Sequence, residues 1–163
     1  MRKIIKRKNT KIGILGGTFD PPHKGHLYIS KIALRKLKLD KLIWIITKKN
    51  PLKKKPYLSE KTRIKLSKKI TNKEKKIFVL YFDDKIKSIS TFNLLNHIKK
   101  KQKKTKLYFL IGADNLIKFH KWSNWKKIPG LAKIVVFPRE NHLIRKNKYI
   151  VSKSLKKKGF NLY

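Results

Sequence analysis

Two histidines three residues apart follow a glycine-rich turn near the start of the chain. Residues 12–15 are mostly apolar, Gly16 and Gly17 come directly after them, and His23 and His26 follow where a helix is expected to begin. Glycine lets backbone N–H groups approach a ligand closely, and the amino end of a helix attracts anions. Imidazole N–H groups can donate to the same anion. The pattern predicts a phosphate-binding site faced by both imidazoles.

The glycine spacing differs from that of the two commonest phosphate loops. The chain contains no Gly-x-x-x-x-Gly-Lys-Ser/Thr segment, and Gly13, Gly16 and Gly17 do not fit Gly-x-Gly-x-x-Gly. The sequence therefore argues against P-loop kinases and dehydrogenases. A simple glycine turn with two surface histidines is the structural alternative.

Composition limits the remaining classes. The chain has 163 residues, of which 40% are hydrophobic, so a single domain spanning residues 1–163 can bury a core. Without cysteine there are no disulfides, thiolate zinc sites or cysteine nucleophiles. The basic start lacks the apolar stretch of a secretory signal, and no apolar run reaches membrane-spanning length. We expect a cytoplasmic protein with no membrane partner.

The charge is strongly positive. The chain has 46 basic and 8 acidic residues, for a formal net charge of +38, which would suit a nucleic-acid binder. The lysines are dispersed along the chain and outnumber the arginines that usually make bidentate contacts. We expect a solvated lysine surface with salt-sensitive adhesion to polyanions but no specific nucleic-acid partner.

Short apolar runs alternate with segments of helical periodicity. Continuous apolar runs of this kind are typical of strands buried on both faces of a parallel sheet. The sequence predicts an α/β fold: a doubly wound, Rossmann-like parallel sheet of about five strands with helices on both faces. The expected strands are 11–15, 42–47, 77–82, 107–112 and 134–137, and the expected helices begin near residues 24, 61, 91 and 114.

In such sheets, ligands bind beyond the carboxyl ends of the strands. Residues 16–26, 48–54 and 112–125 all follow predicted strands. We expect these three segments to converge on one cleft.

Two contiguous patterns resemble a known family. Residues 16–21 and 23–26 resemble the Gly-Gly-Thr-Phe-Asp-Pro loop and the His-x-Gly-His signature of a nucleotidyltransferase superfamily. Residues 110–116, followed by Phe119 and Trp122, resemble the Ile-Gly-x-Asp-x-Leu and Phe-x-x-Trp pattern of bacterial nicotinate-nucleotide adenylyltransferases.

The resemblance implies adenylyl transfer from ATP to nicotinate mononucleotide. The products would be nicotinate adenine dinucleotide, a precursor in NAD biosynthesis, and pyrophosphate. Mg²⁺ would be carried with ATP, held by phosphate oxygens and water rather than by protein ligands. No covalent intermediate on the enzyme is needed, because the acceptor phosphate is already an anionic nucleophile.

The resemblance also implies roles for individual residues. The catalytic residues would be His23 and His26. The ATP-binding residues would be Gly16, Gly17, Thr18, Phe19, His23, His26, Asp114 and Arg139. The acceptor-binding residues would be Lys53, Lys54, Ser90 and Trp122. Taken by themselves, Asp114 could instead cap a helix, Trp122 could be core packing, and the two lysines could be solvent-exposed.

The chain departs from the family pattern in two places. Residues 88–90 read Ser-Ile-Ser where the family commonly has Ser-Tyr-Thr, so the hydroxyls are kept and the aromatic ring is lost. The family's Ile-Ser-Ser-Thr-x-Ile-Arg motif is missing from the basic segment 140–163, so the motifs cover residues 11–139. A truncated product, a fragment, and a member that binds these phosphates through lysines all remain open.

Two other functions also remain open. Pantetheine-phosphate adenylyltransferase has a similar glycine loop, although the segment from Asp114 to Trp125 argues against it. A catalytically impaired basic relative that binds nucleic acid would explain the charge. The sequence does not decide the oligomeric state or the preference between nicotinate and nicotinamide mononucleotide.

Overall fold

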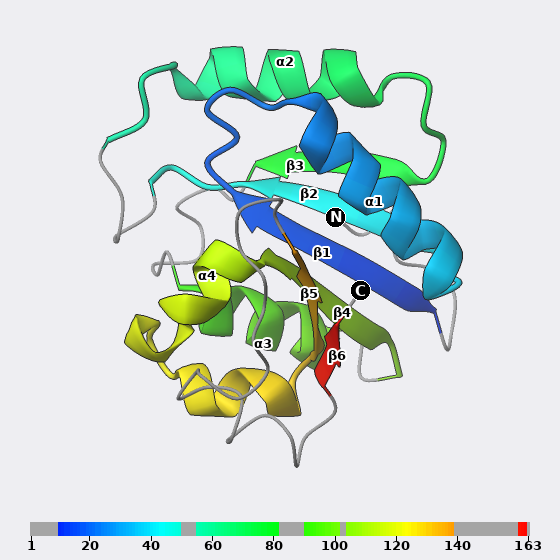
Figure 1. The fold of residues 1–163 in the computed structure, drawn as a ribbon, viewed down its shortest axis with the longest axis vertical. Helices are drawn as coiled ribbons and strands as arrows, with labels where there is room; N and C mark the ends of the chain where they lie inside the picture. The colour runs from blue at the N-terminus through cyan, green and yellow to red at the C-terminus, as the bar shows by residue number, and fades with distance from the viewer. Residues whose placement is uncertain (1–9, 50–54, 82–89, 102–103, 139–159, 163) are drawn as a thin grey trace. The chain divides into compact units, whose positions relative to one another are not determined.

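The computed structural model describes residues 10–49, 55–81, 90–101, 104–138 and 160–162 (Figure 1). The chain divides into two compact units. One comprises residues 11–89, and the other comprises residues 1–10 together with residues 90–163. Within the described ranges, no helix is both long and apolar enough to cross a membrane.

The unit of residues 11–89 is built on three parallel strands. β1 (Lys11–Gly17) pairs with β2 (Lys41–Ile46), which pairs with β3 (Ile77–Tyr81). The middle strand, β2, is buried from Leu42 to Ile46, as its continuous apolar sequence predicts.

Two helices cover these strands. α1 (Lys24–Lys36) packs on β1 and β2, α2 (Glu60–Thr71) packs on β2 and β3, and the helices contact each other (Figure 1). α2 begins at a typical cap, where the Ser59 hydroxyl accepts a hydrogen bond from the Thr62 N–H at 3.2 Å. The two helices therefore share one face of the three strands.

The second unit also contains parallel strands. β4 (Lys106–Gly112) pairs with β5 (Lys133–Phe137), which pairs with β6 (Phe160–Leu162). Its helical segments are α3 (Thr91–Lys101), α4 (Ala113–Ile117) and the 3₁₀ helices η1 (Phe119–Lys121) and η2 (Trp125–Gly130).

The expected α/β class with Rossmann-like parallel strands is confirmed. All five predicted strands are present, with bounds that differ from the expected ones by two residues at most. β6 is a sixth strand that the sequence did not predict. Its three residues pair in parallel with β5, Val135 lying opposite Asn161.

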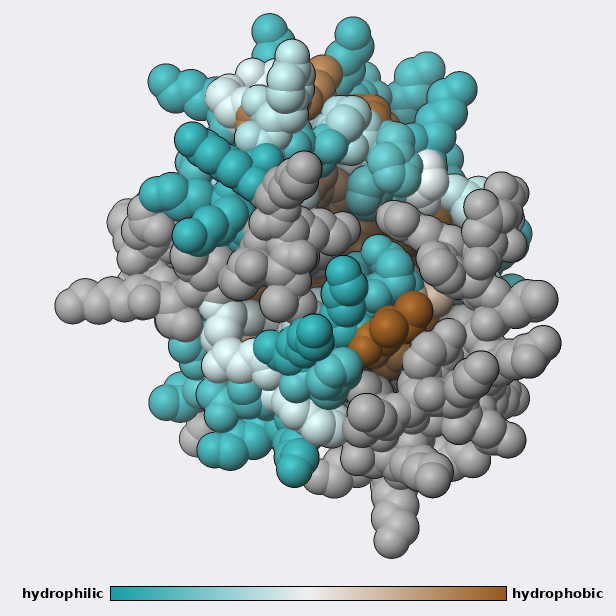
Figure 2. Space-filling view, turned by 60° about the vertical axis from the view of Figure 1, so that its left-hand side comes forward, coloured by the Kyte–Doolittle hydropathy of each residue, from teal (hydrophilic) through white to brown (hydrophobic). Residues whose placement is uncertain are grey.

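Hydrophilic residues cover most of the coloured surface on the face shown in Figure 2. Lysines are exposed on both units, for example Lys61, Lys68 and Lys69 on α2 and Lys126 and Lys127 on η2. This distribution agrees with the dispersed, solvated lysine surface expected from the sequence.

Candidate functional site

β1 ends in two glycines, and the turn that follows returns to the core at an aromatic ring. Gly16 is exposed, whereas Phe19 is 2% exposed and has a φ of 50°. The Phe19 ring stacks on Trp44 of β2, with centroids 4.8 Å apart and an interplanar angle of 20°. The buried ring thus holds the turn while the backbone at Gly16 stays accessible to a ligand.

His23 and His26 are joined at the start of α1. His23 is the N-cap residue, with φ −141° and ψ 169°, and its backbone N–H donates to Nδ1 of His26 at 3.3 Å. The two ring centroids lie 3.9 Å apart. Because Nδ1 of neutral His26 accepts this bond, its proton is carried on Nε2. Local structure therefore makes Nε2 the hydrogen-bond donor of the His26 ring.

The absence of a side chain on Gly25 leaves space for the His23 ring. A Cβ at residue 25 would lie 2.9 Å from Nδ1 and 3.0 Å from Cε1 of His23. Any other residue here would push the imidazole away. The structure thus gives a steric reason for the glycine inside the His-x-Gly-His pattern.

A buried hydrogen-bond chain holds the backbone of His26. The indole N–H of Trp44 donates to Ser30 Oγ at 2.8 Å, and this hydroxyl donates to the His26 carbonyl at 2.7 Å. The His26 ring also lies against Phe19, with centroids 4.8 Å apart. Trp44 and Ser30 are both fully buried. Their contribution was not predicted, although Ser30 lies one helical turn after His26.

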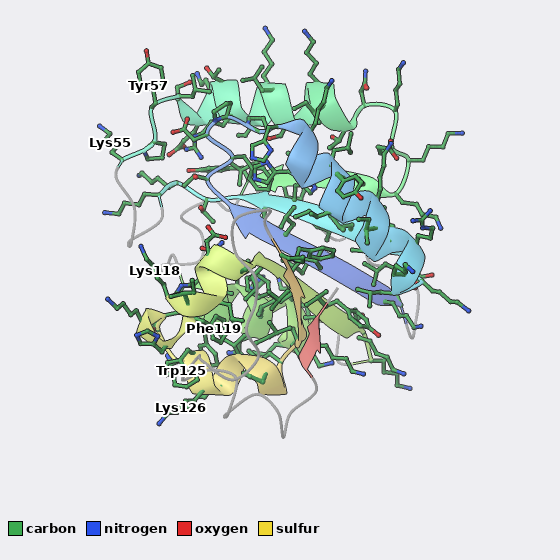
Figure 3. The ribbon with its side chains drawn as sticks, in the orientation of Figure 1. Lys55, Tyr57, Lys118, Phe119, Trp125 and Lys126 are labelled. Carbon is green, nitrogen blue, oxygen red and sulfur yellow. The ribbon has the colours of Figure 1, made fainter. Side chains whose placement is uncertain are left out.

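A second connection runs from the turn to the segment before α2. The Asp20 carboxylate accepts hydrogen bonds from the backbone N–H groups of Tyr57 and Leu58, at 2.5 and 2.8 Å. In Figure 3 the side chains of Lys55 and Tyr57 project outward from this segment, and Tyr57 is 95% exposed. Asp20 therefore holds the backbone of a segment whose Lys55 and Tyr57 side chains are exposed.

Arg63 reaches the same region from α2 and was also not predicted. Its side chain is 1% exposed, and within the described residues it donates to backbone carbonyls, among them those of Thr18 and Thr47. The turn after β1 and the chain after β2 are thus joined by one buried guanidinium.

Asp114 and Ser90 lie at the starts of helices in the second unit. The N-cap of α4 is Gly112, so Asp114 lies within the first turn and the alternative that Asp114 is the cap is wrong. Ser90 is followed by α3, and its Oγ accepts a hydrogen bond from the Asn93 N–H at 3.2 Å. The Ser90 hydroxyl thus has a structural function in addition to the predicted acceptor contact.

Trp122 is half-buried against other aromatic rings. Its ring centroid lies 5.1 Å from Phe119 and 6.0 Å from Phe109. Trp125 meets the edge of Phe119 at 6.2 Å and has Lys126 Nζ 5.8 Å from its ring centroid (Figure 3). Trp122 therefore contributes to packing, and its stacking on a ligand stays a prediction.

Three predicted site residues, Lys53, Lys54 and Arg139, lie outside the described residues. In the described part of the chain, no three His, Asp or Glu side chains are grouped so that they could hold a metal ion. The expected convergence of the three loops on one cleft stays a prediction.

Comparisons with known proteins identify the family. The profile of the cytidylyltransferase-like family matches residues 14–158. The chain is 46% identical over 153 residues to a probable nicotinate-nucleotide adenylyltransferase of Pelagibacter ubique, covering 94% of this chain and 84% of the relative. A protein of the same description from Ruegeria sp. is 37% identical over 128 residues, covering 78% of this chain and 67% of the relative.

A solved structure shares the fold. The nicotinic acid mononucleotide adenylyltransferase of Plasmodium falciparum, complexed with NaAD, superposes with a TM-score of 0.79 at 20% identity, covering 94% of this chain and 74% of that one. The chain therefore belongs to the cytidylyltransferase-like family and, within it, to the nicotinate-nucleotide adenylyltransferases.

Proposed function

We propose that the chain transfers the adenylyl group of ATP to nicotinate mononucleotide, releasing pyrophosphate and forming nicotinate adenine dinucleotide. The observation that carries this proposal is the pair of imidazoles on His23 and His26, 3.9 Å apart, at the start of α1. The relatives from Pelagibacter ubique and Ruegeria sp. are named for the same reaction.

The reaction exchanges one phosphate bond for another. A phosphate oxygen of the mononucleotide attacks the α-phosphorus of ATP, the bond to the bridging oxygen of the β-phosphate breaks, and pyrophosphate leaves with the electron pair. The attacking oxygen is already anionic, so no general base is required. The protein's contribution is to align the two substrates and to stabilise charge that develops on the phosphoryl oxygens.

His26 and His23 supply donors for that charge. Nε2 of His26 carries its proton because Nδ1 accepts the His23 N–H, so the donor is set before ATP arrives. The His23 ring is held beside Gly25 and is exposed. Backbone N–H groups from Gly16 to Phe19, together with the Thr18 hydroxyl, complete the proposed cradle for the ATP phosphates.

The metal ion enters as part of the substrate, MgATP. Mg²⁺ keeps several waters and commonly binds through phosphate oxygens together with few protein ligands. In the residues that the structure describes, the nearby carboxylate of Asp20 already accepts two backbone N–H groups. We therefore propose that the metal is held mainly by ATP phosphate oxygens and water.

The remaining substrate contacts come from residues that the family resemblance suggested. Asp114 and Arg139 would bind the adenosine part of ATP, while Lys53 and Lys54 would meet the phosphate of the mononucleotide. The Ser90 hydroxyl would approach the nicotinate, and the half-buried Trp122 ring would stack on its pyridine.

An acceptor comparison tests the proposed function. Pyrophosphate release is measured with MgATP and, in turn, nicotinate mononucleotide, nicotinamide mononucleotide and phosphopantetheine. We expect nicotinate mononucleotide to give the highest kcat/KM. Faster turnover with phosphopantetheine, or salt-sensitive RNA binding with no turnover on any acceptor, would contradict the proposal.

A further inference from the structure

Arg63 is a buried cation that is paired with no anion in the described part of the chain. Its side chain is 1% exposed, and its described partners are all backbone carbonyl oxygens. Four of its five N–H donors are used: Nη1 donates to Thr18 at 2.6 Å and Thr47 at 2.8 Å, Nη2 to Lys48 at 3.2 Å, and Nε to Leu58 at 3.2 Å.

The four carbonyls belong to three separate segments. Thr18 lies in the turn after β1, Thr47 and Lys48 follow β2, and Leu58 precedes α2. A planar guanidinium directs its donors in fixed directions, so it fixes these segments relative to one another in a way that a lysine ammonium cannot. Arg63 is therefore the common hydrogen-bond partner of three segments.

The neighbouring carboxylate strengthens this arrangement. The Asp20 carboxylate accepts a hydrogen bond from the N–H of Leu58. The carbonyl of Leu58 accepts a hydrogen bond from Nε of Arg63. The backbone of Leu58 is thus held on both sides, once by the turn after β1 and once by α2. The Thr47 N–H also donates to the Gly17 carbonyl at 2.9 Å, which joins the ends of β1 and β2 directly.

A contribution to folding stability does not by itself explain why an arginine is buried at position 63. Burying a guanidinium removes its hydration, and apolar side chains of similar volume often stabilise a core at least as well. What the guanidinium does provide is a fixed geometry between loops, which a nonpolar side chain cannot impose.

We propose that Arg63 is a positioning residue that fixes the backbone of Thr18, in the proposed ATP-phosphate turn, relative to Thr47 and Lys48 at the end of β2. This inference rests on the proposed function, which places the ATP phosphates at the turn that contains Thr18. Loss of Arg63 should therefore misalign the ATP phosphates with the acceptor more than it weakens the binding of either substrate.

The test compares Arg63→Lys and Arg63→Ala with Arg35→Lys and Arg35→Ala, which change an exposed arginine on α1. Misplacement by about 1 Å can reduce turnover about 10²-fold, so we expect kcat to fall on that order in both Arg63 variants. The KM values for ATP and for the mononucleotide should each change less than fivefold, a bound set from about 1 kcal/mol. The Arg35 variants should match the wild type.

Two measurements separate positioning from stability. Thr71→Val removes the bonds from Thr71 Oγ1 to the Ser67 and Lys68 carbonyls in α2, and it should lower the melting temperature without touching the loops. Its kcat per folded molecule should stay unchanged. Millimolar guanidinium chloride should restore part of the kcat of Arg63→Ala, whereas sodium chloride of equal ionic strength should not.

The outcomes are distinct. If the wild-type protein shows no turnover with any acceptor, the proposed function is wrong and this inference fails with it. Active wild type together with folded Arg63 variants of unchanged kcat overturns only the positioning role. The same conclusion follows if guanidinium gives no rescue, or if neither Arg63 variant yields folded protein, because Arg63 is then a stability residue.

Discussion

The imidazole of His23 occupies the space that a side chain on residue 25 would need. A Cβ built on Gly25 would lie 2.9 Å from His23 Nδ1, closer than real Cβ atoms approach such a group. A side chain at position 25 therefore requires the His23 ring to shift. This contact makes the geometry of the imidazole pair sensitive to one methyl group.

Replacing Gly25 with alanine should reduce turnover without destabilising the protein. The new methyl group displaces the His23 ring, while alanine is a better helix former than glycine. We expect kcat to fall at least tenfold, with a melting temperature that is unchanged or higher. Gly130→Ala is the control, because nothing lies within 4 Å of a Cβ there. A Gly25→Ala variant with normal kcat would show that the His23 position is unimportant.

His26→Asn should keep the fold and lose the activity. The asparagine side chain can still accept the His23 N–H, as Nδ1 of His26 does at 3.3 Å, but it lacks the Nε2 donor. Removing one preorganised donor of this kind typically lowers kcat on the order of 10²-fold or more. His23→Ala should have a similar effect. Steady-state kinetics and thermal unfolding check both variants, and near-normal kcat in either would refute the role of that histidine.

Gly17→Ala and Gly13→Ala should differ in what they damage. A Cβ at Gly17 would meet the Phe19 ring at an ordinary 3.5 Å, whereas a Cβ at Gly13 would lie 2.7 Å from Leu39 Cδ1. We expect Gly17→Ala to weaken ATP binding at nearly normal stability, and Gly17→Val to abolish it. Gly13→Ala should lower stability with normal ATP affinity in the folded fraction. Calorimetric titration with ATP that shows full affinity in Gly17→Val would exclude close approach to this backbone.

Trp122→Ala should weaken binding of the mononucleotide more than binding of ATP. Aromatic stacking contributes about 0.5–1.5 kcal/mol beyond burial, so the mononucleotide Kd should rise roughly two- to tenfold. Trp125→Ala controls for lost packing, because Trp125 also meets the Phe119 ring. If the Kd values for ATP and for the mononucleotide rise equally, or if the melting temperature falls while both Kd values stay unchanged, Trp122 contributes to core packing alone.

The free energy of unfolding should decrease in mild acid because of His97. Partial burial, and to a lesser extent the positive charge of Lys101, lower the pKa of His97 from its ordinary 6.5. The unfolded chain therefore takes up this proton first, and stability is lost as the pH falls through about 6.5 towards the lower pKa of the folded state. His97→Gln should flatten this part of the profile in urea unfolding. An NMR titration should show a higher His97 pKa in Lys101→Gln, and an unchanged pKa would refute the contribution of Lys101.

The amino-acid sequence by itself determined the strands, the start of α1 and the family. The runs ending at Leu15, Thr47 and Gly112 are mostly apolar, short and separated by segments of helical periodicity, which together favour strands buried in a parallel sheet. The glycines and histidines between residues 16 and 26 are contiguous, so their joint placement follows from local geometry. That is why the phosphate-binding turn could be predicted without coordinates.

Only the tertiary structure decided which residues hold that turn in place. Arg63 lies in a lysine-rich helix and resembles a surface residue until its contacts with Thr18 and Thr47 are seen, 45 and 16 residues away. Trp44 meets Ser30 across 14 residues through a single hydrogen bond. β6 pairs with β5 through backbone groups that every residue possesses. Such contacts depend on where the folded chain brings distant segments together, and no local spacing or periodicity encodes them.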